Sequence, residues 1–226
     1  MLTVETDLRP NFGPARDQGK RPTCLAFAAS DAHAGLRTGW VPLSCEFAFY
    51  HAQRRSNSSP LQSATLESML DALRLDGQPD EEGWPYLPDL PTDHADWFPP
   101  TGANPIFRRR GSACADILAT IIDKLDRNEP VILLTTLSSS FYTPTVAGIV
   151  DPAHGEAPDP ALRHAVIAVG HGAIDRSPAI LIRNSWGAAW GINGYAWLTE
   201  RFLTPRLFAT ASLLEDIYVS AGPVTT

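Results

Sequence analysis

The segment that constrains the fold most strongly is ILIRNSWGAAWGINGYAWLT, residues 180–199. Short β-rich runs lie at its two ends, at residues 179–183 and 195–198, and glycine-rich sequence separates them. This pattern predicts two neighbouring strands joined by a tightly packed loop. Asn184 directly follows the first run, so we expect its side-chain amide to lie at the end of a strand.

The rest of the chain divides into a helical part and a β-rich part. Composition and helical periodicity predict helices near residues 24–36, 44–54, 65–75 and 118–125. Further β-rich runs follow at residues 131–137, 165–169 and 208–219. The chain length allows one large domain or two small ones that share an interface. The order of the elements predicts an α+β fold with two subdomains and a cleft between them.

Composition excludes several classes of protein. The chain has 226 residues, a hydrophobic fraction of 44% and a net charge of −7, which favours a globular protein without a nucleic-acid partner. Its one basic run, Arg108-Arg109-Arg110, is expected to be a solvated turn. No apolar stretch is long enough to span a membrane, and no secretory signal precedes the domain. Three cysteines do not indicate a disulfide framework, so a cytoplasmic location is expected.

Cys24 lies at the start of the first predicted helix, in QGKRPTCLAFAAS, residues 18–30. A helix N-terminus favours the reactive thiolate and offers free N–H groups that can hold an oxyanion. Gln18, on the loop before the helix, can supply a second hydrogen bond to that oxyanion. The alternative is a buried structural cysteine, and this segment alone leaves both interpretations open.

His164 begins the run RHAVIAVGHG, where a strand edge can hold an imidazole rigidly over a cleft. The amide of Asn184 can accept a hydrogen bond from one ring nitrogen, which would turn the other nitrogen toward the sulfur. Trp186 can cover that bond and exclude water. Taken alone, His164 can equally be a surface or core histidine.

Together these segments resemble the papain-like cysteine peptidases. The resemblance spans residues 14–199 and rests on motifs in the family order, namely Asp17-Gln18-Gly19, Cys24 with Ala26-Phe27, His164-Ala165-Val166, Asn184-Ser185-Trp186-Gly187, Trp190-Gly191 and Gly194-Tyr195. The N-terminal part is similar to short bacterial members without disulfides or a propeptide. The resemblance implies a single domain, residues 1–226, in which a helical left subdomain spans about 20–110. A β-rich, barrel-like right subdomain would span about 111–220 together with the N-terminal segment, with the active-site groove between the two.

The resemblance also implies a reaction and its residues. Cys24 would be the nucleophile and His164 the general base and acid, with Asn184 orienting His164. Gln18 and the main-chain N–H of Cys24 would form the oxyanion hole. The expected activity is hydrolysis of peptide bonds in a polypeptide substrate through an acyl-enzyme, with no cofactor and no metal.

The substrate groove departs from the family pattern. Its usual glycine pair is replaced by Ser63-Ala64, and Arg163 stands where the family often has an aspartate before the histidine. An apolar or aromatic substrate residue is expected in the pocket for the second residue on the acyl side, with Arg163 a partner for an acidic one. The residues expected to bind substrate are Ser63, Ala64, Leu134, Leu162, Arg163, Ala165 and Trp186.

Two other classes of function are compatible with these residues. The same site can serve isopeptidase or transpeptidase chemistry, and the fold can also serve as a non-catalytic protein-binding module. The sequence shows no inhibitory propeptide, so the activity of a peptidase is expected to be restrained in another way. A cognate inhibitor, a regulatory partner or a narrow specificity would do so. Delivery elsewhere, by a route that the sequence does not show, is a further alternative. The histidines show no metal-ligand spacing.

Overall fold

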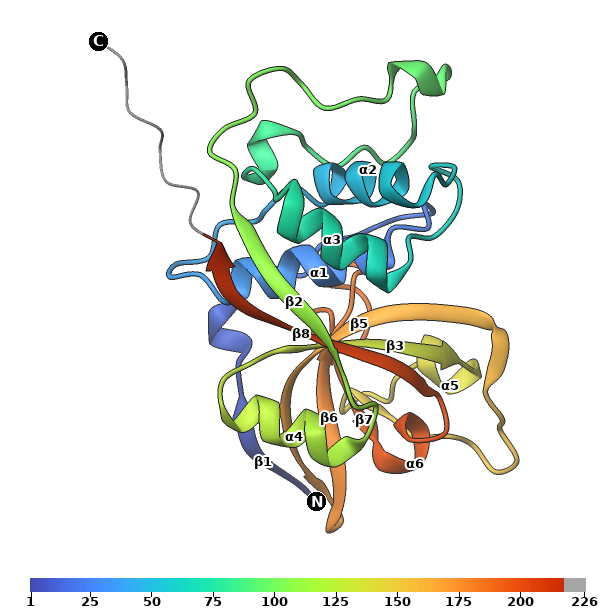
Figure 1. Ribbon diagram of the computed structural model, residues 1–226. Helices are drawn as coiled ribbons and strands as arrows, with labels where there is room; N and C mark the ends of the chain where they lie inside the picture. Colours follow the sequence, from blue (N-terminus) through green and yellow to red (C-terminus); the bar gives the residue numbers. More distant parts are fainter. Residues whose placement is uncertain (218–226) are drawn as a thin grey trace.

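The computed structural model describes residues 1–217 and contains a helical layer packed against a large sheet (Figure 1). The helical layer consists of α1 (Cys24–Gly35), α2 (Cys45–Ser56) and α3 (Leu66–Leu75). Three shorter helices, α4 (Leu118–Asp126), α5 (Ser139–Tyr142) and α6 (Glu200–Leu203), lie with the sheet (Figure 1). This architecture confirms the predicted α+β fold. None of the helices within residues 1–217 is long and apolar enough to cross a membrane.

The described strands form one mixed sheet in the order β2-β8-β3-β5-β6-β7-β4, and β1 pairs with β5 beside this path. Most pairs are antiparallel, but β4 and β7 run parallel. Within residues 1–217 the two end strands, β2 and β4, do not pair, so the sheet curves without closing into a barrel. The strands are β1 (Leu2–Asp7), β2 (Arg108–Cys114), β3 (Val131–Leu137), β4 (Ile149–Val150), β5 (Asp159–Ile174), β6 (Ser177–Arg183), β7 (Tyr195–Thr199) and β8 (Leu207–Ile217).

The helices begin where their capping residues predict. The hydroxyl of Ser44 accepts the main-chain N–H of Phe47, and the hydroxyl of Thr65 accepts that of Ser68, both at 3.1 Å. Helix α1 is buried from its second residue to its last and packs against both α2 and β5. Its composition of small and apolar residues suits this central position.

Four parts of the β structure differ from the prediction. Strand β5 extends well beyond 165–169 at both ends, and neither β1 nor β4 was predicted as a strand. The interpretation of Arg108-Arg109-Arg110 as a solvated turn is wrong, because these residues begin β2. Arg109 is buried there, with an ion pair of 2.7 Å to Asp216 of β8, and this long-range partner neutralises its charge. The predicted last strand, 208–219, is β8 up to Ile217, and its final residues lie outside the described part of the chain.

The proline-rich segment, residues 78–105, packs over the outer face of α2. Trp84 and Trp97 are buried and lie with their ring centroids 6.4 Å apart. Phe98, in contrast, is 58% exposed. The segment is an ordered support for the helical layer.

Candidate active site

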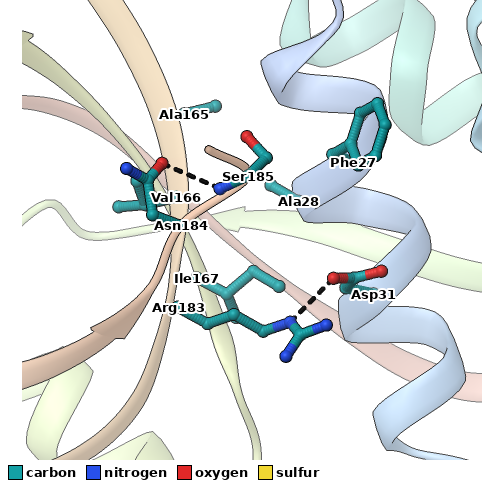
Figure 2. A pocket seen from close by; sticks show the side chains of 9 residues that line it. All are labelled: Phe27, Ala28, Asp31, Ala165, Val166, Ile167, Arg183, Asn184 and Ser185. Atoms are coloured by element: carbon teal, nitrogen blue, oxygen red, sulfur yellow. Dashed lines mark hydrogen bonds and ion pairs between the residues drawn. The ribbon is translucent and has the colours of Figure 1, made fainter. Parts of the chain in front are cut away.

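The predicted chemical residues come from three separate elements that meet at the junction of the two layers. Cys24 is the first residue of α1, His164 lies within β5, and Asn184 follows the end of β6. Cys24 and His164 line the same pocket. Figure 2 shows Asn184 on the sheet side, facing the flank of α1 that carries Phe27 and Ala28.

The hydrogen bonds around Asn184 define the tautomer of His164. Oδ1 of Asn184 accepts the main-chain N–H of Ser185 at 2.8 Å, so this atom is the amide oxygen. The same oxygen lies 2.7 Å from Nε2 of His164, and Nε2 must therefore carry the proton and donate it. In a neutral imidazole, Nδ1 is then left as the acceptor. Nδ1 of the neutral ring can therefore accept a proton.

Aromatic rings enclose the His164–Asn184 bond. The indole of Trp186 lies 4.8 Å from the His164 ring between centroids, and Phe141 meets the same ring edge-on at 5.8 Å. Tyr142 stacks on the outer side of Trp186 at 5.4 Å. His164 is 6% exposed as a result, and exclusion of water strengthens its hydrogen bond to the amide.

The loop that carries Asn184 is joined by main-chain bonds to the loop that precedes Cys24. The N–H of Gln18 donates to the carbonyl of Ser185 at 2.9 Å, and the N–H of Gly187 donates to the carbonyl of Arg16 at 3.0 Å. Gly187 and Gly191 both have positive φ, and a Cβ at Gly191 would collide with the carbonyl of Tyr195. The close backbone packing expected at the two Trp-Gly steps is therefore present.

The side chain of Gln18 is buried in a fixed orientation. Its Oε1 accepts the hydroxyl of Ser185 at 2.7 Å, so Nε2 is the donor, and Nε2 donates to the carbonyl of Arg21 at 2.9 Å. This arrangement uses one of the two N–H bonds of the amide. The second N–H bond has no partner among the described residues, and Gln18 does not line the pocket that contains Cys24 and His164.

A buried ion pair holds the loop between Gln18 and Cys24. Arg21 donates to both carboxylate oxygens of Glu46 at 2.6 and 2.9 Å, and Glu46 has no exposed surface. The same carboxylate accepts the indole N–H of Trp97 at 2.6 Å. On the other face of the loop, Tyr86 donates its hydroxyl to the carbonyl of Gln18 at 2.6 Å. Sequence reasoning missed this pair, because Arg21 and Glu46 show no motif and meet only in the fold.

A second buried ion pair joins α1 to the end of β6. Nε of Arg183 donates to Asp31 at 2.7 Å, as Figure 2 shows, and Arg16 binds the other carboxylate oxygen of Asp31. Arg183 also donates to the hydroxyl of Tyr195 at 2.6 Å. Because Arg183 directly precedes Asn184, this contact sets the position of the histidine's partner relative to the helix that begins with Cys24.

Burial favours the uncharged forms of both reactive groups. It raises the pKa of the Cys24 thiol, and the main-chain N–H groups of Ala165, Leu25 and Cys24 oppose that shift. Burial also lowers the pKa of His164 to about 4, and the hydrogen bond that Nε2 donates to Asn184 opposes this shift only in part. Burial alone therefore opposes a charge on either group.

The depressed pKa of His164 predicts how stability depends on pH. An unfolded histidine takes up a proton near pH 6.5, whereas folded His164 resists protonation until about pH 4, so the unfolded state binds more protons between these values. The contribution of His164 to the free energy of unfolding is therefore fully present above about pH 6.5, and it is lost as the pH is lowered toward 4. Between pH 7 and 4.5 we expect His164 to account for about 2 kcal/mol of the loss in the free energy of unfolding.

Urea denaturation of the wild type and of His164→Gln at these two pH values measures this difference. Buried His33, whose pKa is also lowered chiefly by burial, contributes to the loss in both proteins and cancels from the comparison. An equal loss in the two proteins would contradict the assignment.

The predicted substrate-binding residues fall into two groups. Ser63, Ala64, Leu134, Arg163 and Ala165 line the pocket that contains Cys24 and His164, whose volume is about 430 Å³. Leu162 does not line this pocket and is 39% exposed. Trp186 lies outside it as well, against His164. The lining residues that were not predicted are Leu25, Thr65, Leu66, Phe208 and Ala209.

The two remaining cysteines stand apart from this site. Cys45 is buried in the core, and Cys114 contacts the hydroxyl of Ser212 at 3.3 Å. All three cysteines are free thiols. Within residues 1–217, no group of three or more histidine, cysteine or acidic side chains is placed to hold a metal ion.

Comparison with known proteins identifies relatives of this site and fold. A family model described as papain family cysteine protease matches residues 111–203, which include His164 and Asn184. Cathepsin K of Gallus gallus is 29% identical over 196 residues, covering 83% of this chain and 55% of the relative. The chain spans about half the length of the curated relatives it matches.

Solved structures extend the likeness to the N-terminal part. Xylellain, a cysteine protease from Xylella fastidiosa, matches with a TM-score of 0.74 at 22% identity, covering 94% of this chain and 86% of that one. Digestive procathepsin L 3 of Tenebrio molitor matches with a TM-score of 0.72 at 17% identity, covering 95% and 71%. The predicted papain-like fold and the predicted resemblance to the papain-like cysteine peptidases are confirmed.

Proposed function

Because the chain resembles the papain-like cysteine peptidases in sequence and in fold, we propose that it hydrolyses peptide bonds through Cys24, His164 and Asn184. The observation that supports this most strongly is the hydrogen bonding of Asn184. It commits Nε2 of His164 to donation and leaves Nδ1 as a proton acceptor. A structural histidine does not require a free acceptor beside a pocket that also contains a thiol.

The proposed reaction has two stages. Nδ1 of His164 takes the thiol proton as Sγ of Cys24 bonds to the scissile carbonyl carbon, and the carbonyl π electrons move to oxygen. His164 then gives the proton to the leaving nitrogen, and the C–N bond breaks to leave a thioester. Water, deprotonated by the same nitrogen, attacks the thioester and releases the new carboxyl end and the free thiol.

A digest in ¹⁸O-labelled water tests the proposal. The wild-type chain is incubated with an unfolded protein of known sequence, and mass spectrometry identifies new termini. Hydrolysis is expected to place one ¹⁸O atom in each new carboxyl group. New peptide junctions without ¹⁸O would instead indicate transpeptidation, and an absence of new termini would contradict catalysis and favour a binding module.

Replacement of Gln18 tests the proposed oxyanion hole. Gln18→Ala is expected to lower kcat by about 10²-fold with a smaller effect on KM, because the amide would stabilise charge that develops only in the transition state. Steady-state kinetics on a fluorogenic peptide measures both constants. Ser185→Ala is the matched control, since it removes the hydroxyl that orients Oε1 of Gln18 but leaves Nε2 in place. A change in KM alone would assign Gln18 to substrate binding.

A further inference from the structure

We propose that Arg163 is a specificity-determining residue that selects substrates with a glutamate side chain in the pocket beside Cys24 and His164. This inference rests on the proposed peptidase function and names the substrate class for that site. By the family resemblance, the pocket receives the second residue on the acyl side of the scissile bond. The residues that line the pocket determine which substrate side chain it prefers.

The floor of the pocket is a row of small and apolar side chains across three strands. Leu134 of β3 pairs with Ala165 of β5 on one side and with Ala209 of β8 on the other. Ala64 and Leu66 line the opposite, helical side. The two floor alanines leave space for an aliphatic stem of two or three methylene groups, which this apolar lining would bury.

A bulge in β8 places an aromatic ring at the same pocket. Leu134 pairs with Ala209 and Thr135 pairs with Leu207, so Phe208 is the extra residue between them. Bulges turn a side chain out of the regular alternation and are common beside active sites. Phe208 lines the pocket and is 40% exposed, so its ring is available to neighbouring groups.

The guanidinium of Arg163 lies against that ring, 5.4 Å from its centroid. Its Nε also donates to the carbonyl of Pro160 at 3.4 Å. These contacts keep the cation beside the pocket. Within residues 1–217, Arg163 forms no ion pair with a carboxylate, although the chain carries 25 acidic residues. The pocket therefore combines an apolar lining with a cation that has no carboxylate partner. A side chain with an aliphatic stem and an anionic end fits this combination, and glutamate is such a side chain.

Four peptides that differ only in the residue for this pocket test the inference. They carry Glu, Gln, Leu or Lys there and release the same fluorophore. For the wild type at low salt, kcat/KM for the Glu peptide is expected to exceed that for the isosteric Gln peptide by at least about fivefold. The Lys peptide is expected to be the poorest, and 1 M salt should reduce the Glu/Gln ratio because Arg163 is exposed.

Variants at Arg163 assign the preference to this side chain. Arg163→Gln is expected to bring the Glu/Gln ratio to about one, and Arg163→Glu is expected to favour the Lys peptide. Arg176→Gln is the matched control, because Arg176 is an exposed arginine in the turn at the far end of β5, and it should keep the wild-type ratio. Each ratio is measured within one protein, so a partly unfolded variant still reports its own preference.

Two outcomes separate this inference from the proposed function. Cleavage of the Leu and Gln peptides without any preference for Glu would overturn the role of Arg163 and leave the peptidase intact. No cleavage of any peptide, together with no reaction of Cys24 with an epoxide inhibitor, would overturn both. A Glu preference that persists in Arg163→Gln would also refute the role of Arg163.

Discussion

Replacing Cys24 by serine is expected to lower the rate of peptide hydrolysis by about 10⁴-fold or more while leaving the fold intact. The hydroxyl is a far weaker acid than the thiol, and a neutral imidazole whose pKa is lowered by burial is a weak base for it. Cys24 is only half-buried at the start of α1, so exchange of sulfur for oxygen disturbs little packing. Turnover of a fluorogenic peptide and the urea midpoint measure the two effects.

Cys114→Ser is the control for this substitution. Cys114 is also half-buried, and its sulfur contacts the carbonyl of Ser112 and the hydroxyl of Ser212 at 3.6 and 3.3 Å. Both residues lie outside the pocket that contains Cys24, so this variant should keep wild-type turnover. Undiminished activity of Cys24→Ser, at a purity that excludes a contaminating peptidase, would eliminate Cys24 as the nucleophile. Loss of activity in both variants would point to a general effect of removing thiols.

The second large effect is expected for Glu46→Gln, which should reduce the free energy of unfolding by about 3–5 kcal/mol. Arg21 is 7% exposed and Glu46 is fully buried, so the substitution leaves a buried guanidinium without its counter-charge. It also places an amide N–H₂ where the carboxylate now accepts from Trp97 and Arg21. Urea denaturation measures the loss, and Asp71→Asn is the control, since its ion pair with Arg74 is exposed and should cost below about 1 kcal/mol.

The same variant should also be impaired in catalysis at temperatures where it remains folded. Arg21 lies between Gln18 and Cys24, and Nε2 of Gln18 donates to its carbonyl, so displacement of Arg21 moves the proposed oxyanion donor. We expect kcat to fall more than KM rises. A stable Glu46→Gln protein with wild-type kinetics would show that the ion pair neither stabilises the fold nor positions the loop.

Local signals in the sequence predicted most of the regular structure. The helices predicted near residues 44–54 and 65–75 are α2 and α3, and the run at 131–137 coincides with β3. The strands that were missed depend on distant partners. Strand β1 is mostly exposed and alternates little, and it is held by pairing with β5, while the buried arginine of β2 is tolerated through Asp216. Neither partner can be identified from local pattern.

For the candidate site, the sequence predicted the proposed chemical residues but not the contacts that support them. Cys24, His164 and Asn184 stand in motifs whose spacing indicates their chemistry, and the structure brings His164 and Asn184 into a hydrogen bond. Three supporting features were not predictable, namely the Arg21–Glu46 pair, the Asp31–Arg183 pair and the bulge at Phe208. Each depends on residues far apart in the chain or on strand register, which composition and periodicity do not encode.

The central claim is that Cys24 is a nucleophile activated by His164, and selective labelling tests it most directly. The purified chain is treated with an epoxide inhibitor of cysteine peptidases, and mass spectrometry locates the adduct over time, with His164→Ala in parallel. The account predicts a single fast adduct on Cys24 in the wild type and a much slower one in His164→Ala. No adduct on Cys24, or equally slow labelling of Cys24, Cys45 and Cys114, would contradict it.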